Sequence, residues 1–279
     1  MFKRVVLGLE PSAPDQTTRL AAELAELLHL ELLGLFLEDP SLRNLAAFPF
    51  AREFRLLGGG WHSIELERLS NELEFAIRSA ERSFANAVKD FTTRCQFEVI
   101  RGAVAQAIDS ISRSGDIIVI AEPASPVERV TQHFSWLLNA AFHSTAAVML
   151  VPAQVARVRG PVVAIAVDPA DPSIRVAATI AIAANEDLII VHAHEGESDD
   201  PDLRKLAAET GLIIEHVSTG KAPPLSDLAA RAFPRVQERL IVAIRSVLAP
   251  ERVLSLASSR RVPVLLIAQN ESVPMAPRD

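Results

Sequence analysis

The sequence predicts an α/β protein of two tandem modules, each an open, doubly wound sheet of five parallel strands with a Rossmann-like arrangement. The first observation is a repeat: "VVLGLEP" from Val5 returns as "VAIAVDP" from Val163, each an apolar run followed by one acidic residue and proline. The second is that "VMLVPAQ" from Val148 returns as "VLLIAQN" from Val264. The third is that apolar runs without in/out alternation, typical of strands buried on both faces, alternate with helical patterns. Such βα units imply helices on both faces of each sheet.

The first copy, residues 1–152, alternates strands with amphipathic helices. Strands are expected at 4–9, 30–37, 95–100, 116–121 and 146–151, and helices from residue 15, over 66–91, from residue 102 and over 127–143. In the long second helix, apolar residues recur at three- and four-residue steps from Leu66 to Phe91, which predicts one apolar face. Residues 38–63 contain proline, three consecutive glycines and several aromatic residues, so they are interpreted as an insertion.

The second copy, residues 161–268, is shorter. Residues 153–160 are a polar linker, and residues 269–279 are a tail that is expected to fray. Strands are expected at 162–167, 187–193, 212–217, 239–244 and 262–268, and helices at 174–184, 202–209, 225–232 and 250–259.

Composition excludes several classes of function. With 49% hydrophobic and 23% charged residues among 279, the chain is typical of a globular protein. A net charge of −7 without a basic run disfavours nucleic acid and anionic membranes as partners. One cysteine cannot form an internal disulfide, and no apolar run suits a signal peptide or a membrane span, so a cytoplasmic location is expected.

The repeated order of landmarks resembles the universal stress protein family, over nearly the whole chain and twice. The resemblance rests on a buried strand ending in an acidic residue, a Gly-led helix, the "DIIV" strand from Asp116 and the final "VLLI" strand from Val264. In the nucleotide-binding members, the acidic residue approaches the nucleoside. The resemblance places Glu10 and Ser12 at that site in the first copy and Asp168 in the second, with proline where the family usually has glycine.

The family's phosphate-binding glycines are missing from both copies. The resemblance places Ala121 at the first glycine of the loop after the fourth strand, and Phe134 and Ser135 at its Gly-Ser pair. Glycine lets backbone N–H groups reach phosphate oxygens, which a side chain obstructs. In the second copy, "IVAIRSVLAPERVL" passes from strand to helix with almost no loop. We therefore expect degenerate nucleotide sites and no cofactor, with ATP disfavoured.

Three other features have competing interpretations. The aromatic insertion could cover an apolar ligand pocket, dock another subunit or cap the core of its own module. His192 and His194, with Glu195, form too small a set to predict a metal site, and none is expected. Cys95 has no activating neighbour in the sequence and is interpreted as a structural thiol.

The resemblance also implies that modules pair through their last strands. We therefore predict that Val148–Val151 pairs with Val264–Ile267 within one chain as an intramolecular pseudo-dimer, which would bury two sheet edges, and further association into a homodimer is left open.

The resemblance implies a stress-response protein that acts by binding a ligand or a protein partner without catalysis. An alternative is a member that binds ATP, and slowly hydrolyses it, through altered contacts around Glu10, Ser135 and Asp168. A further alternative is a carrier of a small apolar ligand held under the insertion. No hydrolase motif with a glycine elbow is present in the sequence.

Overall fold

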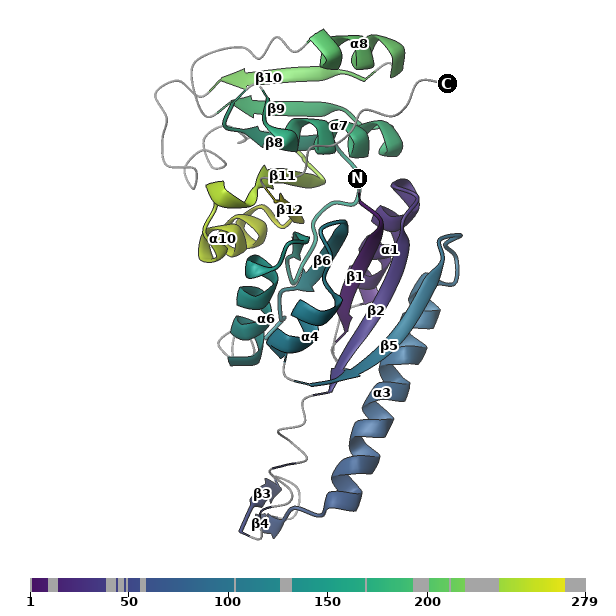
Figure 1. Cartoon of the computed structure of the whole chain (residues 1–279), viewed down its shortest axis with the longest axis vertical. Coiled ribbons are helices and arrows are strands. Elements are labelled where there is room, and N and C mark those ends of the chain that lie inside the picture. The colour runs from purple at the N-terminus through teal and green to yellow at the C-terminus, as the bar shows by residue number, and fades with distance from the viewer. Residues whose placement is uncertain are drawn as a thin grey trace.

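A computed structural model shows the fold of this chain (Figure 1). The structure describes residues 2–9, 15–38, 44, 48, 50–55, 59–102, 104–125, 132–168, 170–192, 201–210, 212–218 and 236–268.

One ten-stranded sheet forms the centre of the molecule, in the order β10-β9-β8-β11-β12-β7-β6-β1-β2-β5. The first half of the sheet contains β1 (Arg4–Leu9), β2 (Glu31–Glu38), β5 (Cys95–Arg101), β6 (Asp116–Ala121) and β7 (Ala147–Val151). The second half contains β8 (Val162–Ala166), β9 (Leu188–His192), β10 (Ile214–Ser218), β11 (Leu240–Ile244) and β12 (Val264–Ile267). Counted from the centre outward, both halves have the same strand order, and all neighbours within a half are parallel.

The two halves join through antiparallel pairing of β7 with β12. Val148 lies opposite Leu266, Met149 opposite Leu265 and Leu150 opposite Val264. Every residue of both strands is buried, because helices cover both faces of the sheet at this point. The predicted pairing of the last strands is confirmed, and it merges the two five-stranded sheets into one.

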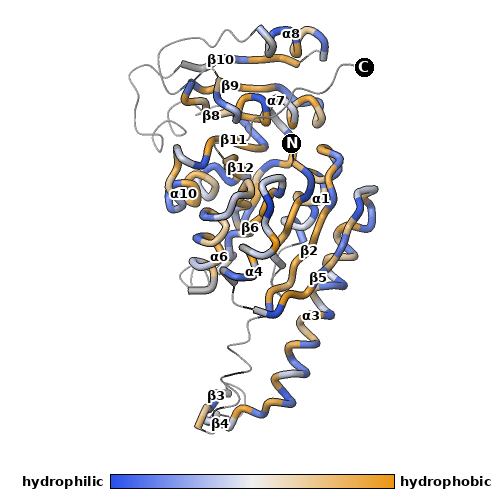
Figure 2. Tube along the Cα trace, in the orientation of Figure 1, coloured by the Kyte–Doolittle hydropathy of each residue, from blue (hydrophilic) through white to orange (hydrophobic). Residues whose placement is uncertain are grey.

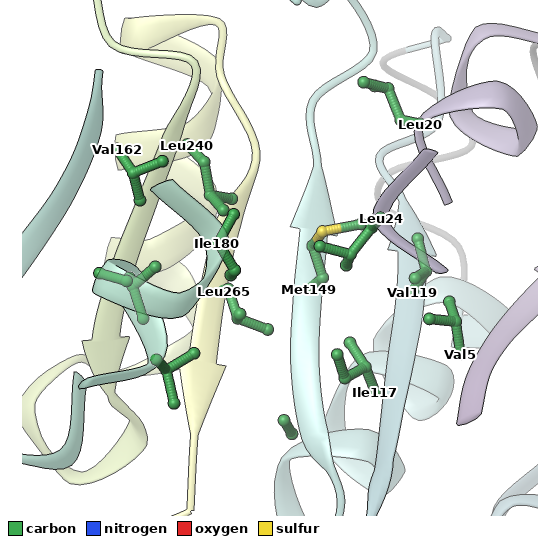
Figure 3. Packing of buried hydrophobic residues seen from close by; sticks show 14 of the residues in the cluster. Val5, Leu20, Leu24, Ile117, Val119, Met149, Val162, Ile180, Leu240 and Leu265 are labelled. Atoms are coloured by element: carbon green, nitrogen blue, oxygen red, sulfur yellow. The ribbon is translucent and has the colours of Figure 1, made fainter. Parts of the chain in front are cut away.

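Helices lie on both faces of the sheet, as the doubly wound prediction requires. One face carries α1 (Asp15–Leu27), α3 (Leu66–Val88), α7 (Pro172–Ala184) and α8 (Pro201–Thr210), and the other carries α4 (Val104–Ile111), α6 (Gln132–His143) and α10 (Pro250–Arg260). Figure 3 shows Leu24 of α1 beside Met149 of β7, and Ile180 of α7 beside Leu265 of β12. Both apolar layers therefore continue across the junction between the halves. None of the described helices is long and apolar enough to cross a membrane.

The described part of the insertion forms a hairpin far from the sheet. Strands β3 (Arg52–Arg55) and β4 (Gly60–Ser63) pair at the amino-terminal end of α3, which projects beyond the sheet (Figure 1). Phe54 is 54% exposed and Trp61 is 66% exposed. Of the three interpretations of the insertion, capping of the core is therefore wrong for these two side chains, because the long helix carries them away from the sheet. The helix predicted at 225–232 lies outside the described residues.

Candidate functional site

The strand order gives each half one switch point, which is the place where open α/β sheets bind ligands. Such ligands bind at the carboxyl ends of the strands, at the point where the winding direction changes. That point lies between β1 and β6 in the first half and between β8 and β11 in the second. These are also the strands whose ends carry the positions implied by the family resemblance.

At the end of β6, a carboxylate reaches from the first half into the second. Ala121 is the last residue of the strand, pairs with Val151 and is followed by Glu122, which is 6% exposed. The hydroxyl of Ser258, on α10, donates to both carboxylate oxygens of Glu122 at 2.9 Å, and the backbone N–H of Ala153 donates to Oε2 at 3.2 Å. Glu122 thus connects the end of β6 to the segment between β7 and β8 and to a helix of the second half.

At the end of β11, an arginine reaches in the opposite direction. Arg245 is the first residue after the strand, and its Nη1 donates to the carbonyl oxygens of Phe142 at 2.9 Å and Ser144 at 2.6 Å. Its Nη2 donates to the carbonyl oxygen of Ala146. The carbonyl of Phe142 belongs to the last turn of α6, where helical carbonyls lack partners within the helix, and those of Ser144 and Ala146 follow the helix. A short 3₁₀ turn, Arg245–Val247, then leads to α10, so the near absence of a loop predicted from the sequence is confirmed.

Glu122 and Arg245 occupy equivalent positions in the two halves. Met149 and Leu265 face one another at the centre of the junction, and they pair with Val119 of β6 and Val242 of β11, respectively. Glu122 and Arg245 each lie three residues further along the chain. In each half, the residue that follows the fourth strand, β6 or β11, is therefore charged and bonds to the opposite half.

Phe134 and Ser135 follow each other on α6 but have different environments. Phe134 is 4% exposed and belongs to the apolar cluster that contains Ile118 and Ile120 of β6. Ser135 is exposed. The phenylalanine therefore fills space over β6, while the hydroxyl of Ser135 lies at the surface of α6.

In the second half, the polar residues after β8 stabilise the loop and the helix that follow. Asp168 is exposed, and its Oδ1 accepts a hydrogen bond from the backbone N–H of Ala170 at 2.9 Å. Asp171 is 2% exposed and is the N-cap of α7, accepting from the backbone N–H groups of Ser173 and Val167, both at 2.8 Å. Sequence reasoning missed Asp171, although an aspartate directly before a proline at a helix start is a recognisable capping signal. Glu10 and Ser12 lie outside the described residues.

Sequence reasoning also missed Glu122 and Arg245. Glu122 lies within the loop that was compared with the family's glycines, and Arg245 follows the equivalent strand. Aligning the two copies at the residue after the fourth strand would have shown that the two positions carry opposite charges. It would not have shown which groups of the other half they bind.

His192 pairs with a histidine that the sequence pattern did not suggest. Its Nε2 lies 3.0 Å from Nδ1 of His216, and the two rings are parallel with centroids 5.3 Å apart. One ring must donate and the other accept, so the contact requires at least one neutral imidazole. His194 and Glu195 lie outside the described residues, and within the described part no group of three or more histidine, cysteine or acidic side chains could hold a metal ion.

Cys95 lies at the start of β5, half-buried, and its thiol donates to the carbonyl oxygen of Thr93 at 3.3 Å. Burial raises the pKa of this thiol above its ordinary value. Because the thiolate is the reactive form, we expect slower alkylation by iodoacetamide at neutral pH than for a free cysteine, measured by mass spectrometry. Protein unfolded in urea should react at the ordinary rate, and equal rates in folded and unfolded protein would contradict a buried structural thiol.

Comparison with known proteins agrees with this architecture. No protein-family model matches the sequence, and no curated protein matches it. A universal stress protein from Archaeoglobus fulgidus DSM 4304 matches with a TM-score of 0.60 at 14% identity, over 96% of this chain and 97% of that one. A functionally unknown protein from Pseudomonas aeruginosa PAO1 (16% identity) and one from strain UCBPP-PA14 provisionally assigned to the universal stress proteins (15%) both match with a TM-score of 0.50. Each match covers 97% of this chain and 94% of the other. The chain therefore has the fold of the universal stress proteins over almost its full length.

Proposed function

We propose that this chain is a cytoplasmic, universal-stress-type protein that binds a partner or a ligand without catalysis, and that its two former nucleotide positions hold the molecule together. The observation that carries the proposal is that Glu122 and Arg245 each form hydrogen bonds with the opposite half of the molecule. These residues stand at the ends of the two strands where the family's phosphate loops begin. Their hydrogen bonds serve the junction between residues 1–152 and 161–268, which we propose as the two modules.

The electrostatics of the first half support the loss of phosphate binding. Two buried carboxylates lie at the carboxyl ends of its strands: Glu122 after β6, and Glu38 at the end of β2. Glu38 pairs with Arg101 of β5 at 2.9 Å. A phosphate at this edge would approach negative charge and the buried ring of Phe134, in place of free backbone N–H groups.

In the second half, the short connection after β11 and the bonds of Arg245 also support the loss of phosphate binding. Only residues 245–249 separate β11 from α10, and three of them form the 3₁₀ turn. Arg245 is the cation nearest the strand end in the sequence, and its guanidinium donates to three carbonyls of the first half. A phosphate would have to displace these hydrogen bonds, and the junction between the halves would lose them.

The alternative of an apolar ligand carrier finds little support in the described residues. A cavity of about 30 Å³ lies at the junction, with Leu24, Met149 and Ile180 among its lining residues. A cavity that binds benzene measures about 150 Å³, so this one has room for roughly one water molecule. A larger groove of about 640 Å³ runs along α3, but the described residues that line it, including Phe75 and Arg78, all come from that one helix.

Titration calorimetry with Mg·ATP tests the proposal. We expect no binding in the micromolar range by the wild-type protein, no nucleotide released on heating it, and no phosphate production above the buffer rate. Micromolar binding would contradict the proposal. In that case, Ser135→Ala and Asp168→Ala would show which half binds ATP. Glu122→Gln removes the charge but keeps the size of the side chain, so ATP binding by this variant alone would identify electrostatic repulsion as the barrier.

A further inference from the structure

Most of the exposed large apolar residues of the described chain lie on its projecting part. We define the arm as the described residues between Phe48 and Ser79, which include β3, β4 and the first fourteen residues of α3. The described chain has ten exposed large apolar residues, and six of them lie in the arm: Phe48, Phe50, Phe54, Trp61, Leu66 and Phe75. Figure 2 shows apolar positions along α3 beyond the edge of the sheet. An exposed apolar concentration of this kind marks an interaction site.

The helix of the arm presents an apolar stripe that the body of the protein does not cover. Leu66, Leu69, Leu73 and Ile77 continue the face on which Ala80, Phe84 and Ala87 are buried. No residue from Leu66 to Ser79 is buried. This stretch is about 21 Å long at 1.5 Å per residue. Isolated helices shorter than about 12–15 residues are marginal in water, so a helix extended this far gains stability from a partner on its stripe.

The hairpin of the arm also presents an open apolar face. Glu53 of β3 forms an ion pair with Arg68 of α3, so the face of the hairpin that carries Glu53 points toward the helix. Side chains alternate along a strand, so Phe54 and its cross-strand partner Trp61 point away from the helix. Their rings form an edge-to-face pair with centroids 5.5 Å apart. A two-stranded hairpin is marginally stable alone, and a partner against this aromatic face would stabilise it.

We propose that the arm is a homodimerisation surface, and that its occupant is the arm of a second copy of this chain. Phe75 lies nine residues after Leu66, about half a turn around α3 from the stripe, so it is not counted with the other exposed residues. The other five exposed apolar residues of the arm, which are 49–80% exposed, present roughly 600 Å² of apolar side chain if each full side chain offers about 200 Å². Stable interfaces bury about 600–1,000 Å² on each partner, so the arm reaches the lower end of the size that a dimer needs. A twofold axis brings the same patch of both copies together.

Charge also favours a second copy over other occupants. Between residues 50 and 79 the sequence has four arginines and five glutamates. Two nearly neutral arms can approach each other without net repulsion, although the whole chain carries a net charge of −7. The arm has no excess of positive charge for an anionic membrane or for nucleic acid.

Sedimentation velocity of the full-length protein tests the proposal across micromolar concentrations. We expect a monomer–dimer equilibrium that Trp61→Ala weakens by about tenfold or more, since a buried tryptophan is a common hot spot. Trp136→Ala is the matched control, because Trp136 on α6 is 54% exposed but lies outside the arm. It should leave the equilibrium unchanged. Circular dichroism should show both variants folded, as neither side chain is buried.

The fluorescence of Trp61 gives a second, independent measurement. The chain has two tryptophans and no tyrosine, so Trp136→Phe leaves Trp61 as the main emitter. Its emission should shift to shorter wavelength as the concentration rises through the dimer dissociation constant. A protein that stays monomeric, or a dimer that Trp61→Ala leaves intact, would overturn the proposal. Monomers that bind neutral or anionic lipid vesicles through Trp61 would also overturn it, and would identify a membrane surface as the occupant.

Discussion

Replacing Arg260 with alanine is expected to lower the free energy of unfolding by about 3–5 kcal/mol, measured by urea unfolding followed by circular dichroism. Arg260 ends α10 and binds both carboxylate oxygens of Glu238, at 2.6 and 2.7 Å, and the carbonyl oxygen of Val236 at 3.0 Å. Glu238 is 0% exposed and lies two residues before the start of β11. The alanine variant would leave a buried carboxylate without its main counterion, which costs far more than the loss of a surface ion pair.

Two further variants separate this cause from a general weakness of α10. Arg252 lies on the same helix and is exposed, so Arg252→Ala should change the free energy of unfolding by about 0.5 kcal/mol or less. Combining Arg260→Met with Glu238→Leu should recover most of the lost stability, because it removes the buried charge together with its partner. If Arg260→Ala behaved like Arg252→Ala, the ion pair would have no structural role.

Replacing Arg245 with alanine is expected to lower the free energy of unfolding by about 2–4 kcal/mol, because three carbonyls in and just after the last turn of α6 lose a charged donor. The effect should be local to the junction. Hydrogen exchange should therefore accelerate in β7 and β12 more than in the edge strands β5 and β10. Arg245→Lys should give an intermediate loss, because a single ammonium group cannot reach all three carbonyls with the geometry of a guanidinium. Unchanged stability would instead suggest that Arg245 is held for a ligand.

The central sheet could be predicted from the sequence because burial on both faces leaves a strong signal. The segments that became β1, β6, β7 and β12 are apolar at nearly every position, which only a central parallel strand or a covered junction explains. The repeat then predicted two sheets of the same kind, and the family resemblance identified the two final strands as partners. The order of the strands within each sheet came from the structure. The likeness to universal stress proteins followed from the same order of elements.

The contacts at the strand ends could not be predicted in this way. Ser258 is 136 residues from Glu122 in the sequence, and Phe142 is 103 residues from Arg245. Hydropathy patterns report which face of an element is buried, but not which polar group lies beside which across an interface. The missing glycines led to the expectation that phosphate binding is disfavoured, and the tertiary structure showed that Glu122 and Arg245, at the ends of the fourth strands, bond to the opposite half.

The long helix α3 shows most simply which features the sequence determines and which only the tertiary structure decides. The sequence determined that α3 has one apolar face from Leu66 onward, because helical periodicity is a local property of the chain. Only the tertiary structure decided that the sheet covers this face from Ala80 on and leaves the part before it open. The reason is that burial depends on where neighbouring elements end. The sheet is shorter than the helix, and no periodicity within the helix records that length.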